Sequence, residues 1–350
     1  MEDQLLTYYE RELTFIREMG AEFAKKYPKI AGRLLLEPDK CNDPHTERLI
    51  EAFAFIAGRI HRKIDDDFPE ITEALLNIVY PHYIRPIPSL SIVRFDPIAQ
   101  NISETGYRVK KGTSLFSKPV KGVPCQFVTS QPVHIWPVEV VGASLQDPKR
   151  PIGDARQCIQ IGLKTFNGFK LTDIGWKSLR FYLNGQSQHV FSLYELLMNH
   201  VLHIEIEAPT DTGEKERIVL SPRNLRQVGF EPDEGVLPFP RRSFPGYRLL
   251  IEYFCFPERF LFVDLFGLER LCHMKLGEEV TIWFYLDRAP RSSLVVDTDT
   301  FCLNAVPAVN LFHRIAEPIR VEQRKVEYRV IPDIRRQDRK STRLNSSHYS

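Results

Sequence analysis

The first 88 residues repeat apolar and charged positions with the period of amphipathic helices. Before Pro28, which ends the first segment, apolar residues recur at steps of three, four and seven: Leu5, Tyr9, Ile16, Met19, Phe23 and Tyr27. A second segment begins at Asp43, a typical N-cap followed by Pro44, and its apolar stripe is Leu49, Phe53, Ile56, Ile60 and Ile64. A third segment follows Pro69, with Ile71, Leu75 and Ile78 on one side. We therefore predict three helices. The prolines of "YPHYIRPIP" should end the third helix and begin a rigid, extended segment.

After Pro88 the pattern changes to short runs of alternating apolar and polar residues. Such runs include "SIVRF", "CQFVTS", "VHIW", "VEVVGASL", "CIQIGLKTF" and "SLRFYLN". Runs of this length, bounded by Gly, Pro, Ser and Asp, are typical of antiparallel strands in a sandwich or barrel. The stretch "HVFSLYELLMNH" is long and apolar enough for a helix inserted across the sheet. The predicted fold class is α+β, with an N-terminal helical segment followed by β-rich, mainly antiparallel, sandwich- or barrel-like domains.

Changes in composition suggest where the domains begin and end. The proline-rich stretch "EPDEGVLPFPRRSFPG" (231–246) predicts a linker or a long surface loop. Within "YRLLIEYFCFPERFLFVDL" a helix should lead into a strand. We predict a helical region at 1–88, a β-rich domain with the inserted helix at 89–229, and an incomplete second mixed domain at 230–338.

The last residues, "RKSTRLNSSHYS" (339–350), are polar and show no apolar period. They resemble translated sequencing-adapter sequence, so we predict a non-native tail. The native protein should continue differently after about residue 339.

Composition and charge exclude several classes of function. The formal net charge is +2 with 26% charged and 43% hydrophobic residues, and no long block of like charge occurs, so nucleic acid is not an expected partner. No run of eighteen apolar residues predicts a membrane-spanning helix, and the acidic start "MEDQLLTYYEREL" does not resemble a signal peptide. We expect a cytoplasmic protein. The six cysteines, at 41, 125, 158, 255, 272 and 302, form no CxxC pair and are expected to be reduced and mostly buried.

The consecutive aspartates Asp65, Asp66 and Asp67 are the most conspicuous candidate for chemistry. They fall between the predicted second and third helices, where carboxylates would face the partial positive charge of a helix N-terminus. A calcium loop would need alternating oxygen ligands and a central glycine, which "DDDFPEITEALL" lacks. We therefore interpret the three aspartates as architectural, with a metal site or a partner contact as the alternatives.

Other candidate residues are scattered. On a strand, His203, Glu205 and Glu207 would share one face, as metal ligands or as a solvated or partner-facing edge. The pair Cys272–His273 fits a packed turn or helix end, and Arg241 with Arg242 makes a thin basic patch. Trp136, Trp176 and Trp283 are single and more typical of a core. Common phosphate-binding, zinc-protease and serine-hydrolase motifs are absent. We assign no catalytic, cofactor or metal residues and predict no enzyme.

Several long stretches resemble one known family. They are "YYERELTFIREMGAEFAKKYPKIAGRL", "DPHTERLIEAFAFIAGRIHRKIDDDFPEITEALLNIVYPHYIRPIPS" and "NAVPAVNLFHRIAEPIRV" with "EYRVIPD". Together they resemble TssF, the type VI secretion baseplate subunit also called VasA or ImpG, over roughly residues 1 to 338. Members of that family are longer, so this sequence is expected to be an N-terminal fragment.

The resemblance implies a structural role in a baseplate wedge, without cofactors. It implies one TssG-like subunit and a second TssF copy as partners, with TssE- and TssK-like subunits in the same wedge. The wedges would surround a spike hub and form the platform on which the contractile sheath polymerises. The first two apolar stripes should then pack within or between subunits. Two alternatives come from other classes: a β-sandwich module that binds glycans or a receptor, and a hydrolase that uses Asp65 to Asp67 or His203 with Glu205.

Overall fold

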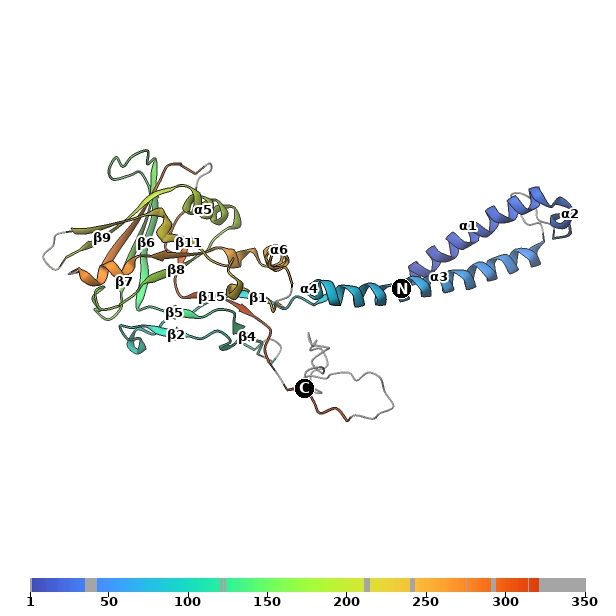
Figure 1. Cartoon of the computed structure of the whole chain (residues 1–350), viewed down its shortest axis with the longest axis horizontal. Helices are drawn as coiled ribbons and strands as arrows, with labels where there is room; N and C mark the ends of the chain where they lie inside the picture. Colours follow the sequence, from blue (N-terminus) through green and yellow to red (C-terminus); the bar gives the residue numbers. More distant parts are fainter. Residues whose placement is uncertain are drawn as a thin grey trace. The chain divides into compact units, whose positions relative to one another are not determined.

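The structure is a computed structural model, and it describes residues 2–34, 43–119, 122, 124–210, 215–239, 243–274, 276–290, 294–313 and 315–320 (Figure 1). The chain forms two compact units, Met1–Arg85 and Pro86–Ser350, each with most of its contacts within itself. Each unit is described separately.

The first unit is a pair of long helices with short helical turns. Its elements are α1 Glu2–Lys26, α2 Pro28–Ala31, the 3-10 turn η1 Gly32–Leu34, α3 Pro44–Val79 and α4 Pro81–Ile84. The predicted start of the second helix is confirmed, because the Asp43 side chain accepts a hydrogen bond from the main-chain nitrogen of His45 at 3.0 Å. The Thr46 hydroxyl and this amide lower the pKa of Asp43, since both stabilise the carboxylate.

The prediction of a separate third helix was wrong. Helix α3 runs without interruption through Asp65–Asp67 and Pro69, so the aspartates do not face a helix N-terminus. A proline inside a helix removes one backbone hydrogen bond, and here the apolar period continues on both sides of it. Asp65 instead accepts a hydrogen bond from the Tyr8 hydroxyl on α1 at 2.8 Å. Asp65 therefore links α1 to α3, and the side chains of the other two aspartates lie outside the described ones.

Helices α1 and α3 approach closely through small residues. Ala54 is fully buried, and a Cβ at Gly58 would lie 3.1 Å from the main-chain nitrogen of Tyr9. A polar pair also joins the two helices, because Glu12 Oε1 lies 2.6 Å from His61 Nδ1. Because α3 presents small residues to α1, its larger apolar side chains are left for other surfaces.

Replacement of Gly58 by valine should force the two helices apart. We expect a loss of about 1–3 kcal/mol in the unfolding free energy of the helical unit, because the added atoms would meet main chain that cannot rotate away. The same replacement at Gly20 on α1, where a Cβ would meet nothing within 4 Å, is the matched control. Thermal unfolding followed by helical circular dichroism measures both. Equal midpoints for the two variants would contradict this packing.

The second unit is built from antiparallel sheets. Its strands are β1 Leu90–Arg94, β2 Tyr107–Val109, β3 Ser114–Phe116, β4 Gln126–Thr129, β5 Val133–Ile135, β6 Val138–Gln146, β7 Gln157–Thr165, β8 Ser178–Leu183, β9 Val201–Pro209, β10 Lys215–Leu220, β11 Leu225–Gln227, β12 Phe262–Phe266, β13 Glu279–Leu286, β14 Phe301–Cys302 and β15 Ala305–Val309. The sheet orders are β10-β9-β13-β7-β6, β11-β12-β8-β14, β1-β15-β4-β3 and β2-β5. Their pairing is antiparallel throughout the described strands, so the predicted α+β class is confirmed.

The main core lies among the five-stranded sheet, the β8–β12 strands and α5. Ile161 of β7, Ile204 of β9 and Phe284 of β13 are buried there together with Phe181 of β8. The predicted inserted helix is confirmed as α5 Ser187–Asn199, whose buried face includes Leu193. The predicted helix before β12 is also present, as α6 Pro245–Cys255.

The observed units differ from the predicted division at residue 230. Strands from before and after that residue alternate in three sheets: β13 lies between β9 and β7, β12 between β11 and β8, and β15 between β1 and β4. Because the sheets share strands from both segments, 89–229 and 230–320 fold as parts of one unit. Residues 321–350, including the predicted tail at 339–350, lie outside the described residues.

Candidate interaction surfaces

Helix α3 carries a long, exposed apolar stripe. Its members follow steps of three, four and seven residues: Leu49, Phe53, Ile56, Ile60, Ile64, Ile71, Leu75 and Ile78. The exposed fraction of their side chains lies between 48% and 72%. Spacing of this kind is the seam along which one helix packs against another. The sequence predicted this stripe, and within the described part of the chain the stripe is not buried.

The helical unit buries little of its own apolar surface. Its buried apolar residues, among those the structure describes, are Ala24, Ala31 and Ala54. Apolar burial is the main source of stability, and three alanines supply little of it. Large exposed apolar patches on a soluble protein mark interaction sites, so this unit has the chemistry of a helix pair that is completed by other helices.

Helix α6 has its charged side buried and its apolar side exposed. Arg248 and Glu252 are 4% and 0% exposed. The residues pointing outward are Tyr247, Leu250, Tyr253 and Phe254, with Phe254 at 79% exposed. This reverses the usual arrangement of a surface helix. Sequence analysis missed it, although charges four residues apart in the apolar stretch "YRLLIEYFC" are an unusual pattern that could have indicated it.

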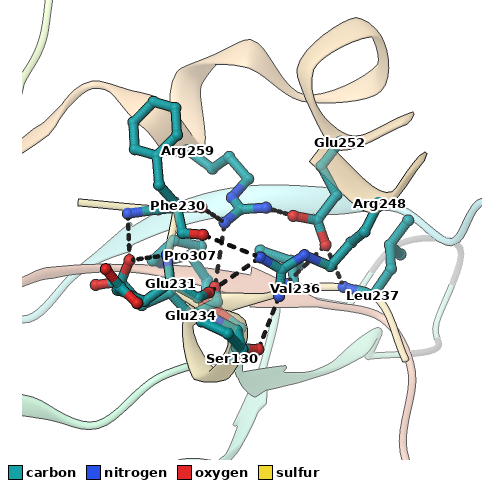
Figure 2. A network of polar contacts seen from close by, with 12 residues as sticks. Ser130, Phe230, Glu231, Glu234, Val236, Leu237, Arg248, Glu252, Arg259 and Pro307 are labelled. Carbon is teal, nitrogen blue, oxygen red and sulfur yellow. Dashed lines mark hydrogen bonds and ion pairs between the residues drawn. The ribbon is translucent and has the colours of Figure 1, made fainter. Parts of the chain in front are cut away.

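The buried charges of α6 bind the chain segment before the helix (Figure 2). Glu252 Oε1 accepts hydrogen bonds from the main-chain nitrogens of Val236 at 3.0 Å and Leu237 at 2.9 Å. Arg248 donates through Nη1 to the Pro232 carbonyl at 2.7 Å. Residues 231–239 are therefore a loop whose main chain is held by side chains of α6, which agrees with the predicted loop and not with its alternative, a linker. Arg241 and Arg242 lie outside the described residues.

Arg259 adds a second buried cation to this network. It is 1% exposed, pairs with Glu252, and donates to the Gly229 carbonyl. Burial and the neighbouring charge of Arg248 lower the pKa of Arg259 to about 10, which Glu234 partly opposes. Arg259 is still protonated at neutral pH, so the Glu252 carboxylate pairs with a buried positive charge.

Strand β9 holds its predicted acidic face inside a sheet. Glu205 is 6% exposed, accepts a hydrogen bond from the Tyr285 hydroxyl at 3.0 Å and lies 3.3 Å from Arg217 Nε. Arg217 also reaches Glu207 at 3.5 Å, and His203 stacks on Tyr285. These residues share one face, as predicted, but β9 lies between β10 and β13, so the prediction of a solvated edge is wrong. The carboxylates are engaged in ion pairs within the sheet.

The remaining candidates are mostly structural. Trp176 is buried in the main core, Trp136 is half-buried against it, and Trp283 packs on the opposite sheet face under the Lys149 ammonium. Cys272 and His273 are the last two residues of the short 3-10 helix η6 Leu268–His273, in agreement with the predicted helix end. Cys158 and Cys302 are buried, but Cys125 and Cys255 are exposed, which differs from the expected burial of most thiols. Cys41 lies outside the described residues.

In the described part of the chain, the candidate residues for catalysis and for glycan binding are not gathered at one site. This part contains no cluster of three His, Cys, Asp or Glu side chains suited to a metal ion. Two cavities, of about 590 and 620 Å³, are lined by neither Asp65 nor Glu205. Tyr107 and Phe116, two exposed aromatic residues on strands, lie in different sheets, which does not favour a coplanar aromatic platform. Among the described helices none is long and apolar enough to cross a membrane.

Comparisons with known proteins agree with one another. The family model described as "Type VI secretion system, TssF" matches residues 1–343. The chain is 36% identical over 345 residues to type VI secretion system component TssF1 of Pseudomonas aeruginosa PAO1, covering 95% of this chain and 55% of the relative. It is also similar to a chain of a TssK-TssF-TssG baseplate subcomplex solved by cryo-electron microscopy, with a TM-score of 0.70 and 29% identity over 83% of this chain and 54% of that one. A chain of a type VI baseplate complex is 27% identical with a TM-score of 0.43. The sequence thus spans about half the length of these relatives.

Proposed function

The chain belongs to the TssF family of the type VI secretion system, and from this membership we propose that it is a structural component of the baseplate wedge. In this role it binds a TssG-like subunit and a second TssF copy, in a wedge that also holds TssK- and TssE-like subunits around the spike hub. The solved subcomplex that it resembles contains TssK, TssF and TssG, which supports the first of these partners. The sheath is then assembled on this platform at the cytoplasmic face of the inner membrane.

The exposed stripe of α3 is the observation that supports the partner-binding part of this proposal most directly. Leu49, Phe53 and Ile78 are more than half exposed, so the apolar face of α3 is not buried by the described part of the chain. Stable assemblies bury large and partly apolar interfaces, and helices of other subunits would cover this stripe in register. We propose that the helical unit enters a bundle with helices of the TssG-like subunit and the second TssF copy.

We further propose that the protein has no enzymatic activity of its own. An active site needs a pocket in which polar groups converge, free to act on a substrate. The candidate carboxylates are occupied instead, Asp65 by the Tyr8 hydroxyl and Glu205 by Tyr285 and Arg217. The protein would act by fitting its shape against its neighbours.

Co-expression of the chain with a TssG-like subunit tests the proposed function. We expect a complex of two copies of this chain with one TssG-like subunit, because the α3 stripes need partner helices for burial. Native mass spectrometry of the purified complex gives the composition directly. A chain that remains monomeric beside a folded TssG-like protein would contradict the proposal for this part of the family sequence.

A further inference from the structure

The chain contains two asparagine–glycine pairs, Asn167–Gly168 and Asn184–Gly185. An asparagine loses its side-chain amide most easily when glycine follows it, because glycine has no side chain to shield its main-chain nitrogen or to restrict its rotation. Both asparagines lie in exposed loops, the first after β7 and the second between β8 and α5. The two pairs therefore have the same local chemistry, and a difference in their reactivity would arise from the fold.

The first pair is held in a tight turn. Asn167 and Gly168 both have positive φ, at 56° and 73°. The Phe169 amide donates to the Phe166 carbonyl at 3.1 Å, which completes a type I′ turn. In this left-handed conformation the main-chain nitrogen of the next residue lies opposite Cβ across the Cα–C bond, far from the side chain. The Asn167 side-chain amide also donates to the Ala99 carbonyl, so Asn167 reaches the Gly168 nitrogen only when the turn opens.

The second pair is restrained on one side only. The Asn184 amide donates to the Thr300 carbonyl at 2.9 Å, and Nδ2 of the same residue donates to the Asp299 carbonyl over a longer 3.3 Å. Neither bond restrains rotation about the Cα–C bond of Asn184, which positions the Gly185 nitrogen. Among the described residues, none accepts a hydrogen bond from the Gly185 N–H. Asn184 also does not share the left-handed conformation of Asn167, so its side chain can approach the Gly185 nitrogen without the opening of a turn.

We propose that Asn184 is a site of spontaneous deamidation and that Asn167 is protected by its turn. The Gly185 nitrogen attacks the side-chain carbon Cγ of Asn184, and a bond forms between these two atoms. The bond from Cγ to Nδ2 breaks at the same carbon. The proton of the Gly185 amide passes to Nδ2, which leaves as ammonia, and a cyclic succinimide remains in the main chain.

Water then opens the succinimide at one of its two carbonyl carbons. Attack at Cγ gives aspartate, and attack at the main-chain carbonyl gives isoaspartate, in which the main chain runs through Cβ. Either product replaces the Nδ2 donor by a carboxylate, which can only accept, beside the Asp299 carbonyl oxygen. Asn184 also lines the cavity of about 620 Å³, so the reaction adds a negative charge to that surface. This inference does not depend on the proposed function.

Peptide mapping by mass spectrometry tests this proposal on the folded chain, sampled over time at mildly alkaline pH. Deamidation changes the peptide mass because a hydroxyl replaces an amino group, and electron-transfer fragmentation distinguishes isoaspartate from aspartate. We expect the peptide with Asn184 to convert at least about tenfold faster than the peptide with Asn167, because the turn around Asn167 must first open locally. Equal rates, or faster conversion at Asn167, would overturn the proposal.

The same measurement on the chain unfolded in urea is the matched control. Without the fold neither pair is restrained, so the two asparagines should convert at comparable rates. A difference that persisted in urea would come from the neighbouring residues in the sequence and would overturn the protective role of the turn. A folded chain in which neither asparagine changed, while both converted in urea, would overturn the assignment of Asn184.

A variant locates the reaction at one side chain. In Asn184→Gln the mass change of this peptide should disappear, because the longer side chain closes the corresponding ring far more slowly. The exposed position of Asn184 allows the added methylene group without a clash in the core. A mass change that persisted in this variant would place the reaction at another residue of the peptide and would overturn the proposal.

Discussion

Replacement of Phe53 or Ile56 by aspartate should abolish recovery of the wedge complex with the TssG-like subunit. Both side chains are more than half exposed on the α3 stripe, so neither change removes a contact within the described chain that folding needs. In a helix bundle the new carboxylate would be buried without a partner, at a cost of several kcal/mol. At about 1.4 kcal/mol for each tenfold change, the affinity should fall at least about 100-fold. An affinity pull-down with the tagged TssG-like partner, quantified against the unmodified chain, measures the loss.

A matched control keeps the added charge and moves it off the stripe. Asn77 is exposed on the same helix, and Asn77→Asp changes the net charge by the same amount. This control should be recovered like the unmodified chain, and all variants should keep their helical circular dichroism. If the Phe53 and Ile56 variants fold and are recovered in full, the α3 stripe is not the surface that binds the TssG-like subunit.

Replacement of Glu252 by alanine should destabilise the β-rich unit by about 3–5 kcal/mol, the range for removing one partner of a buried ion pair. The change leaves Arg259 buried without its carboxylate partner, and the amides of Val236 and Leu237 lose their acceptor. Unfolding in urea followed by tryptophan fluorescence reports on this unit, because Trp136, Trp176 and Trp283 all lie within residues 86–350.

The matched control is an exposed leucine, which should contribute less to stability than the buried glutamate of the same helix. Leu250 lies on the same helix and is 56% exposed, so Leu250→Ala should change the unfolding free energy by no more than about 0.5 kcal/mol. A glutamate would then matter far more to this helix than a leucine. If Leu250→Ala proved as destabilising as Glu252→Ala, the assignment of the buried side of α6 would be wrong.

Local patterns predicted the elements well where the local signal and the tertiary structure agree. The cap at Asp43, the inserted helix α5, and strands such as β7 and β9 all appear where alternation or helical spacing placed them. The break expected at Pro69 did not occur, because the apolar seam of α3 continues across it and outweighs one lost hydrogen bond. The interleaving of strands from both sides of residue 230 could not be predicted, since pairing partners far apart in sequence leave no local trace.

The interaction surfaces were predicted in part. The α3 stripe was predicted from residue spacing alone. The contact of α1 with the small residues Ala54 and Gly58 was not predicted, because both faces of α3 looked able to pack. The Arg248–Glu252–Arg259 network was missed because charges in an apolar segment are normally placed outward.

The pairing of β1 with β15 has a consequence for synthesis. Leu90 pairs with Val309, so β1 leaves the ribosome 219 residues before its partner. At about 5–20 residues per second, β1 waits roughly 10–45 s with both edges open. During translation, therefore, β1 is an unpaired strand that can be bound by ribosome-associated chaperones or can pair with a non-native strand. Co-translational shielding of this segment would help to decide how much of the protein reaches its assembled state.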